Sequence, residues 1–496
     1  MEAKELTRGA GILMAITSLP SSYGIGTLGD AAFRFVDLLV DLKQRYWQVL
    51  PIGPTSYGDS PYQSLSSFAG NPYLIDLDRL MREGLLTQGE IRGFNWGSDE
   101  RDIDYANLFE NRFQVLKLAF ERFDTEQTAF RRFVERNSFW IEDYAQFMTI
   151  KTELGNREWT TWPDELKMHD EKAVTSYCEK FEGQTDFWKF TQYKFYEQWD
   201  ELRQYANARG VQLIGDIPLY AALDSADVWA CRERFQVEAD GTLKNVAGSP
   251  PDSFAEEGQV WGNPLYNWDY MEKHGFEWWK NRMRANAGLY DVIRIDHFLG
   301  IVKYYSIPAK HDGANSGKWN KGPGKKLIDA VETELGSCKV IAENIGTPIP
   351  GAKKLLGRVG WPGIKILMFA FDGDTANEHL PHNYTETNQV VYAGTHDNET
   401  IVGHFRDKTE YELAYLYEYM NINSKEEIPD AFIRLAYSSI ADVVIVQMQD
   451  ILRLGNEARM NQPSTVGHNW KWRLGTDTLS EERRAWIRTL ATVYRR

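Results

Sequence analysis

Short apolar runs recur along the chain, and polar or turn-forming residues bound each of them. The runs are rich in Val and Ile, which is typical of strands buried on both faces of a parallel sheet. Eight strands are predicted, at residues 11–16, 46–51, 211–218, 291–297, 338–344, 363–370, 389–396 and 442–448. Eight is the number of parallel strands that closes a barrel, so the pattern predicts an α/β fold of the (β/α)8 TIM-barrel type.

Helical periodicity precedes most of these strands. The clearest predicted helices cover 28–44, 185–209, 276–287 and 325–335. The last three stop before Gly210, Gly288 and Gly336, and a glycine after the final turn is a helix C-cap signature. Strands and helices therefore alternate as a barrel requires.

One long span separates the second and third predicted strands. Residues 78–184 are far more than one crossover helix needs, and helical periodicity is clearest at 107–136 and 138–154. We expect a mainly helical insertion there, whose aromatic stripe belongs to its core.

A second insertion is expected at 219–275, between the third and fourth strands. Its segment 248–268 combines adjacent prolines with four aromatic residues and shows neither a helical nor a strand period. Long irregular segments of this kind are commonly lids or binding loops, so we interpret 248–268 as a lid loop. Too few residues follow the eighth strand for a β-sandwich of ~100 residues, and we expect 1–496 to be a single catalytic barrel without a C-terminal β-sandwich domain.

Acidic residues stand where four of the predicted strands end. Asp216, Asp296, Glu343 and Asp397 close the runs VQLIGD, DVIRID, CKVIAE and QVVYAGTHD. Each alone is compatible with a helix cap or a turn. The carboxyl ends of barrel strands lie at one face, however, and catalytic residues gather there. We therefore expect the four carboxylates to converge on one catalytic pocket.

Composition narrows the possible partners. The chain has 56 basic and 71 acidic residues, a net charge of −15, which argues against nucleic acid and anionic membrane surfaces as partners. Cys178, Cys231 and Cys338 are far apart in the sequence. Neither a disulfide framework nor a metal site is indicated, and a reducing cytoplasm is the expected location.

The beginning of the chain resembles a secretory signal only superficially. Lys4 and Arg8 precede the apolar GILMAI, but Glu2 and Glu5 interrupt the basic region and Pro20 follows soon after the apolar run. We interpret this run as the first strand. No apolar stretch approaches the ~18 residues of a transmembrane helix.

Several strings, in order along nearly the whole chain, carry a resemblance to a known family. They read SLPSSYGIGTLGD, YGDSPYQ, GNPYLIDL, GDIPLY, PPDSFAEEGQVWGNPLY, RIDHF, AENIG and THDNET. In this order and spacing the chain resembles the 4-alpha-glucanotransferases called amylomaltase or disproportionating enzyme. The resemblance implies a retaining enzyme of the α-amylase superfamily that transfers α-1,4-glucan segments to the 4-OH of glucose or another glucan through a covalent glycosyl-enzyme.

The resemblance also implies roles for three of the acids. The aspartate of RIDHF, Asp296, matches the nucleophile; the glutamate of AENIG, Glu343, matches the general acid/base; Asp397 of THDN matches the transition-state stabiliser. Glycosidic cleavage needs such a carboxylic acid and carboxylate pair. Arg294 lies two residues before Asp296, so strand alternation places both on one face, where the guanidinium would keep the nucleophile ionised. Glu343 needs a raised pKa to act as an acid.

Further residues match substrate-binding positions of the family. They are Ser60, Tyr62, Asp216, Gln259, Trp261, Arg294 and His396. Phe254, Phe369 and Asn461 are expected as further substrate-binding residues. The expected partners are α-1,4-glucans, namely maltooligosaccharides and amylose, with glycogen left open. No metal and no organic cofactor is expected.

One departure and two alternatives accompany this interpretation. The family has Asn-x-Pro-Gly-Thr near its C-terminus, whereas here Ser464 replaces the glycine; a positive φ there would cost serine on the order of 1 kcal/mol. A hydrolase of the same fold would use the same acids. A non-catalytic glucan-binding protein would have no need of Asp296, Glu343 and Asp397 together.

Overall fold

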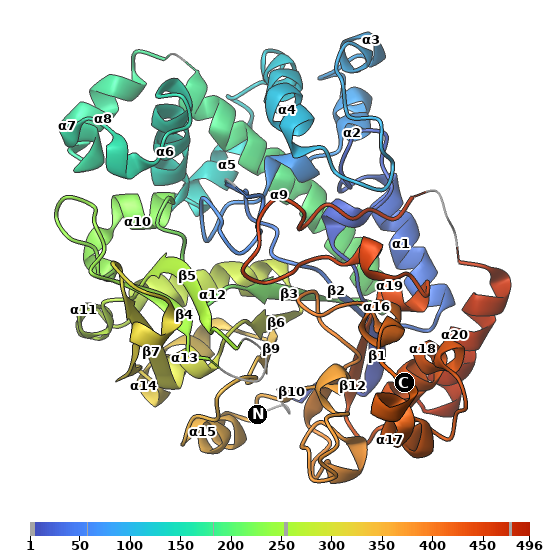
Figure 1. The fold of residues 1–496 in the computed structure, drawn as a ribbon. Helices are drawn as coiled ribbons and strands as arrows, with labels where there is room; N and C mark the ends of the chain where they lie inside the picture. The colour runs from blue at the N-terminus through green and yellow to red at the C-terminus, as the bar shows by residue number, and fades with distance from the viewer. Residues whose placement is uncertain (1–4, 57, 182, 252–255, 476–478) are drawn as a thin grey trace.

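The structure is a computed structural model that describes residues 5–56, 58–181, 183–251, 256–475 and 479–496. Eight parallel strands form one sheet in the order β10, β11, β12, β1, β2, β3, β6, β9 (Figure 1). Their bounds are β1 Gly9–Leu13, β2 Tyr46–Gln48, β3 Gln212–Ile217, β6 Val292–Ile295, β9 Lys339–Ala342, β10 Gly363–Ile366, β11 Gln389–Tyr392 and β12 Val443–Gln447. The eight predicted strands are confirmed.

The two ends of this sheet meet, so the barrel is nearly closed. The Ala342 N–H, at the end of β9, donates to the carbonyl of Pro362 just before β10, at 2.9 Å. The side-chain oxygen of Asn344 accepts the Ile364 N–H of β10 at 2.8 Å. β1, β11 and β12 are buried along their whole length, which explains why their sequences are continuous apolar runs.

Helices surround the barrel between its strands. They are α1 Asp30–Asp41, α9 Gln184–Ala208, α12 Glu277–Leu289, α14 Lys325–Val331, α15 Ala352–Val359, α16 Ile401–Arg406, α17 Glu410–Met420, α18 Ile428–Ser438 and α20 Glu481–Val493. Gly210 follows α9 with a φ of 78°, as a C-cap glycine does. Gly288 was predicted to end its helix, but this prediction is wrong because α12 continues through it to Leu289.

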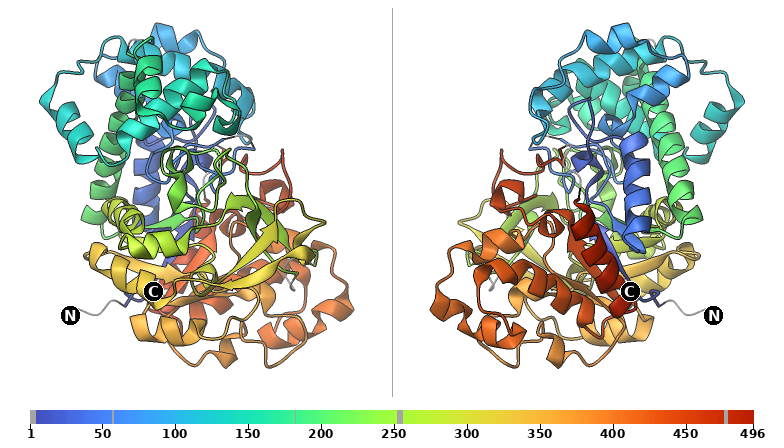
Figure 2. Two further views of the ribbon diagram at one scale, coloured as in Figure 1. Left: turned by 90° about the vertical axis from the view of Figure 1, so that its left-hand side faces the viewer. Right: turned by 90° about the vertical axis from the view of Figure 1, so that its right-hand side faces the viewer.

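The span between β2 and β3 is largely helical. It contains α2 Leu77–Arg82, α3 Gln88–Arg92, α4 Tyr105–Phe120, α5 Thr128–Arg136, α6 Ile141–Glu153, α7 Asp164–Lys167 and α8 Glu171–Cys178. The single helical pattern at 107–136 is two helices, because Asp124 accepts the Glu126 N–H in a turn between them, at 2.9 Å. Figure 2 shows these helices, coloured blue to teal, gathered at one end of the molecule.

Helix α9 connects this helical layer to the barrel. It packs against α6 on the side of the insertion, and against α1 and β3 on the side of the barrel. Its Trp199 is fully buried and donates its indole N–H to the Leu289 carbonyl at 3.0 Å. The two layers therefore share one hydrophobic core.

A second, antiparallel sheet lies beside the barrel. Its order is β5, β4, β7, β8, with β4 Asn245–Ser249, β5 Gln259–Pro264, β7 Lys303–Pro308 and β8 Lys318–Lys321. The segment 248–268, interpreted from sequence as irregular, thus contains the end of β4 and all of β5. The pairing of β4 with β5 shifts register between Val246 and Gly248, and this irregularity hides the strand period.

Short helices complete the fold: α10 Ala226–Ala230, α11 Trp268–Lys273, α13 Leu299–Val302 and α19 Met448–Ile451. After β12 the chain forms α19, a 3-10 turn and α20. Among the described residues, none of the helices combines the length and apolar character needed to cross a membrane.

Candidate active site

The four strand-end acids lie at one end of the barrel. Asp216 belongs to β3, Asp296 and Glu343 directly follow β6 and β9, and Asp397 lies in the loop after β11. β3 pairs with β6 and β6 with β9, so Asp216 stands opposite Arg294 and Arg294 opposite Ile341. The register places Asp216, Asp296 and Glu343 side by side at the carboxyl end of the sheet.

Arg294 bridges two of these acids. Its Nη1 lies 2.6 Å from both carboxylate oxygens of Asp216 and 3.0 Å from Oδ1 of Asp296. The side chains of Arg294 and Asp216 are 4% and 0% exposed, whereas that of Asp296 is 27% exposed. Burial lowers the pKa of Arg294, but the carboxylates of Asp216 and Asp296 outweigh it and hold this pKa well above its usual range. Asp296 is therefore the accessible member of a cluster of one guanidinium and two carboxyl groups.

Tyr62 and His396 form an aromatic wall beside Asp216. The Tyr62 hydroxyl donates to Oδ2 of Asp216 at 2.9 Å, and its ring stacks on His396 with centroids 5.1 Å apart. Burial lowers the pKa of His396, so its imidazole is neutral. Nε2 of His396 lies 3.4 Å from Oδ1 of Asp397.

Glu343 is held by the backbone rather than by a cation. Its carboxylate oxygens accept the N–H groups of His297 and Ile345, each at 2.7 Å. Burial raises the pKa of Glu343, while Arg294 and the two N–H donors oppose the shift. Burial also raises the pKa of Asp296 against the opposing effect of Arg294. Acids this close titrate as a group, and the pocket favours a state in which they retain a proton.

Residues 459–461, which follow α19 and a 3-10 turn, position Asp397. The Asn461 amide donates to Oδ1 of Asp397 at 2.7 Å. Arg459 donates from Nη2 to the Asp397 carbonyl at 2.9 Å and from Nε to the Asn461 carbonyl at 2.8 Å. Ser464, further along the same segment, has a φ of 64°. The left-handed conformation that would favour glycine is thus present at this serine, with a cost on the order of 1 kcal/mol.

The hairpin of β4 and β5 contributes Gln259 and Trp261. The Trp261 indole N–H donates to the Gln259 side chain at 3.0 Å, and its ring meets His297 edge to face at 4.8 Å. The Gln63 amide donates to the Trp261 carbonyl at 3.2 Å, which ties β5 to the loop after β2. The hairpin therefore contacts the residue next to Asp296.

His297 and Gln63 were not predicted from the sequence. His297 has a φ of 47°, and burial lowers its pKa to about 4. Its Nε2 is buried and has no hydrogen-bond partner among the residues that the structure describes. Its position directly after Asp296 was the signal that could have identified it.

The remaining predicted residues are placed less centrally. Ser60 accepts the Tyr62 N–H at 3.3 Å within its own loop. Phe369 lies in a 3-10 turn after β10 and meets His379 edge to face at 5.7 Å. Phe254 lies outside the described residues. No group of three or more His, Cys, Asp or Glu side chains suited to a metal ion occurs within the described part of the chain.

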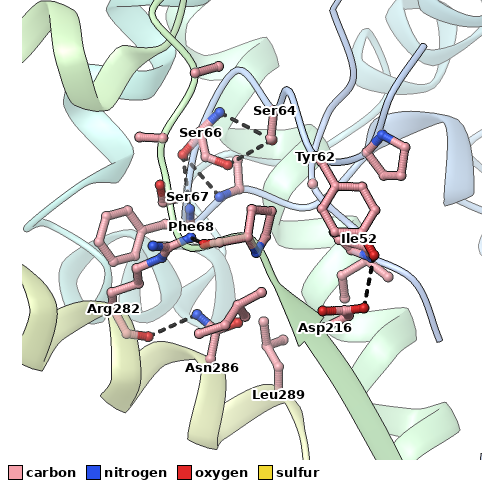
Figure 3. Close-up of a pocket in the computed structure, with 18 of the residues that line it drawn as sticks. Ile52, Tyr62, Ser64, Ser66, Ser67, Phe68, Asp216, Arg282, Asn286 and Leu289 are labelled. Atoms are coloured by element: carbon pink, nitrogen blue, oxygen red, sulfur yellow. Dashed lines mark hydrogen bonds between the residues drawn. The ribbon is translucent and has the colours of Figure 1, made fainter. Parts of the chain in front are cut away.

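A small cavity, of about 50 Å³, lies behind Asp216. Figure 3 shows the Tyr62–Asp216 hydrogen bond at one side of it, with Arg282 and Asn286 toward the other. Nε of Arg282 and the hydroxyl of Tyr220 are buried without a hydrogen-bond partner among the described residues. The volume suits a few water molecules rather than a sugar ring, so we do not place the substrate in this cavity.

Comparison with known proteins gives a consistent result. A sequence model of the family described as 4-alpha-glucanotransferase matches residues 14–478. A 4-alpha-glucanotransferase of Streptococcus pneumoniae is 43% identical over 493 residues, covering 99% of this chain and 97% of the relative. The 4-alpha-glucanotransferase of Thermus thermophilus is 43% identical over 498 residues, covering 98% of this chain and 99% of the relative.

A solved structure resembles the whole chain. The amylomaltase from Streptococcus agalactiae, in complex with acarbose, superposes with a TM-score of 0.94 at 42% identity and covers 99% of both chains. The amylomaltase from Corynebacterium glutamicum is 20% identical and superposes with a TM-score of 0.78. The match covers 98% of this chain and 75% of the relative, and it shows a similar fold.

Proposed function

This chain belongs to the 4-alpha-glucanotransferase family and is an enzyme of that activity, and we propose that it works by double displacement with Asp296 and Glu343 as the reacting pair. In the first step the Glu343 carboxylic acid protonates the glycosidic oxygen while Asp296 attacks the anomeric carbon. The C–O bond to the leaving glucan breaks and an ester bond to Asp296 forms. In the second step Glu343 takes the proton of an acceptor 4-OH, whose oxygen displaces Asp296.

One observation carries this assignment. Asp296 and Glu343 follow adjacent strands, but Arg294 touches Asp296 at 3.0 Å whereas Glu343 is held by two backbone N–H groups. Arg294 opposes the raised pKa of both acids, but its ion pair is with Asp296, so we place the negative charge on Asp296 and the retained proton on Glu343.

The same contacts account for the change of role by Glu343. Once Asp296 is esterified its negative charge is gone, and the pKa of Glu343 falls. The His297 and Ile345 N–H groups then stabilise the Glu343 carboxylate that acts as base toward the acceptor.

Asp397 and its neighbours are proposed to hold the sugar at the cleavage point. Asn461 and His396 both contact Oδ1 of Asp397, which leaves the carboxylate oriented for sugar hydroxyls whose geometry changes in the transition state. Tyr62 offers a ring face, and Ser60, Phe254 and Phe369 are proposed as further glucan contacts.

The β4–β5 hairpin is proposed to act as a lid over the acceptor. Trp261 is half-buried next to His297, so it can exclude water while presenting an apolar face to a sugar ring. An acceptor hydroxyl competes with water only if it is positioned and water is kept out.

The proposed substrates are α-1,4-glucans, with maltooligosaccharides and amylose as donors and acceptors. The relative from Streptococcus agalactiae was solved with the oligosaccharide analogue acarbose, which supports this class of ligand. We also propose a cytoplasmic location, because Cys178, Cys231 and Cys338 are all unpaired.

The direct test is incubation with maltotriose and separation of the products by size. Transfer gives a ladder of shorter and longer maltooligosaccharides together with glucose. Products no longer than the substrate would indicate hydrolysis and would contradict the proposal.

A further inference from the structure

A second cavity, of about 200 Å³, lies between the helical insertion and the barrel. Its walls come from the junction of α5 and α6, from α10 and from the first turn of α12. α12 leads into β6, so its first turn lies at the carboxyl end of the barrel. The cavity is therefore at the same end of the molecule as the acids, but on different elements.

One wall of the cavity is aromatic. Phe68 lies at its centre, with ring centroids 5.4 Å from Phe139, 6.2 Å from Trp140 and 6.0 Å from Trp278. Phe139 is 44% exposed, unlike its buried neighbours. An aromatic face that stays open beside a packed cluster offers apolar contact to a ligand.

The opposite character comes from polar side chains that lack partners. Arg234 is half-buried and lines the cavity. Among the described residues, its guanidinium has no hydrogen-bond or ion-pair partner. The carboxylate of Asp143 has His169 Nε2 at 3.9 Å, beyond hydrogen-bond distance. Asp227 differs, because its oxygens already accept from the Ser67 N–H at 2.7 Å and the Trp278 indole at 3.2 Å.

These features together define the class of ligand. Arg234 only donates and Asp143 only accepts, so a ligand that satisfies both needs groups that do both, as hydroxyls do. Asp227 and Glu277 also line the cavity, so acids outnumber Arg234 there, which disfavours an anionic ligand. The volume is below the roughly 300–1,000 Å³ of sites for drug-sized ligands and suits a single ring. A ring with an apolar C–H face and a rim of hydroxyls fits both walls.

We propose that this cavity is an accessory site that binds one glucosyl unit of an α-1,4-glucan, with Phe139 against the ring and Asp143 and Arg234 on its hydroxyls. This inference rests on the proposed function, because it takes the ligand to be the enzyme's own class of substrate. The accessory site would hold a long glucan near the acids by a second attachment and raise its effective concentration there.

The position of the cavity limits its effect to long substrates. Ser66 and Phe68 line both this cavity and the one behind Asp216, so both cavities adjoin the loop that carries Tyr62. A glucan gains from the accessory site only if it reaches the cavity and the acids at once, so we expect the gain for long chains such as amylose and not for maltotriose. The site should therefore lower the KM for amylose and leave maltotriose turnover unaffected.

The test uses Phe139→Ala and Arg234→Gln, one from each wall, with Tyr411→Ala as a control. Tyr411 is a 91% exposed aromatic on α17, distant in sequence from every residue of the cavity. Both variants should raise the KM for amylose at least about fivefold, a small part of the gain that a second attachment can give. Their kcat/KM for maltotriose should stay within about twofold of the unmodified enzyme, as should both constants of the control.

A second readout does not depend on turnover. Migration in native gels cast with amylose should be retarded for the unmodified enzyme and less retarded for both variants. The accessory site is contradicted if the variants change neither the KM for amylose nor the retardation in the gel. It is also contradicted if turnover of maltotriose and of amylose falls together. Failure of the proposed function looks different: the unmodified enzyme would form no transfer products, while the gel would still report binding at the cavity.

Discussion

Asp296 and Glu343 differ in the groups that touch them. Asp296 is 27% exposed and lies against Arg294, whereas Glu343 accepts two backbone N–H bonds and has burial as the main influence on its pKa. On this difference rests our proposal that Asp296 attacks and Glu343 transfers the proton. Neutral isosteres at these positions separate the two roles.

Asp296→Asn and Glu343→Gln should each lower kcat for maltotriose disproportionation by several orders of magnitude. General acid catalysis alone contributes about 10²–10⁴, and the loss of the nucleophile removes the covalent route. Circular dichroism melting should show that both variants stay folded. A folded variant that retains more than a tenth of the activity would lose its assigned role.

The pKa of Glu343, raised by burial, predicts the pH dependence. Activity needs one proton on the Asp296 and Glu343 pair, so it should fall at low pH as a second proton binds and at high pH as the last one leaves. The alkaline fall should begin above the ordinary glutamate range of about 4.3, because the folded pKa is raised. The measurement is kcat/KM for maltotriose across pH.

A maltosyl fluoride donor isolates the acid role, since fluoride leaves without a proton. With this donor Glu343→Gln should keep most of its kcat/KM and show no alkaline fall. A variant equally impaired with fluoride and with maltotriose would contradict general acid catalysis by Glu343.

The sequence located the acids, but not all of their contacts. Asp216, Asp296 and Glu343 could be placed because an acid ending an apolar run is visible in the sequence, and strand alternation gave the Arg294–Asp296 pair. The Tyr62–Asp216 and Gln63–Trp261 hydrogen bonds join segments far apart in the chain, and only the folded register brings them together. The roles of the site residues remain predictions.

Among the elements, the barrel strands were predictable and the second sheet was not. Barrel strands are buried on both faces, so the apolar run itself is the signal. β4, β5, β7 and β8 are partly exposed, and β8 has no fully buried residue. Their stability comes from antiparallel pairing between distant segments, which no local period reports.

The β4–β5 hairpin carries a prediction of its own. Trp261→Ala should lower transfer more than hydrolysis and raise the glucose released per transfer event, because the apolar cover over the acceptor is lost. Val260, the next residue on β5 and 37% exposed, lies on the other face of the strand, so Val260→Ala is the matched control. Both rates are measured on maltotriose.

An unchanged ratio of transfer to hydrolysis in Trp261→Ala would remove the hairpin from the role of a lid. A ratio that changes equally in Val260→Ala would point to general loosening of the hairpin instead.

For the whole molecule, the shared core predicts one unfolding transition. Tyr144 of the insertion, Trp199 of α9 and Val444 of β12 belong to the same buried cluster. Trp199→Ala should cost about 3–5 kcal/mol and lower the melting temperature of insertion and barrel together. Phe109→Ala, at a 53% exposed position on α4, is the control and should change little.

Two probes follow this transition, tryptophan fluorescence and far-ultraviolet circular dichroism. Coincident curves are expected for the unmodified enzyme and for both variants. Separate transitions in the unmodified enzyme would show that the helical insertion folds as an independent unit.

The seam of the barrel lies next to the residue that handles the proton. β9 and β10 meet through two hydrogen bonds, one between the backbones of Ala342 and Pro362 and one from the Ile364 N–H to the side chain of Asn344. Ala342 and Asn344 are the residues directly before and after Glu343 in the chain. A joint that relies on a side-chain amide opens more easily than a continuous ladder. Local opening of this joint would displace Glu343. A glucan bound across the acids should therefore slow amide hydrogen exchange more at the junction of β9 and β10 than elsewhere in the barrel.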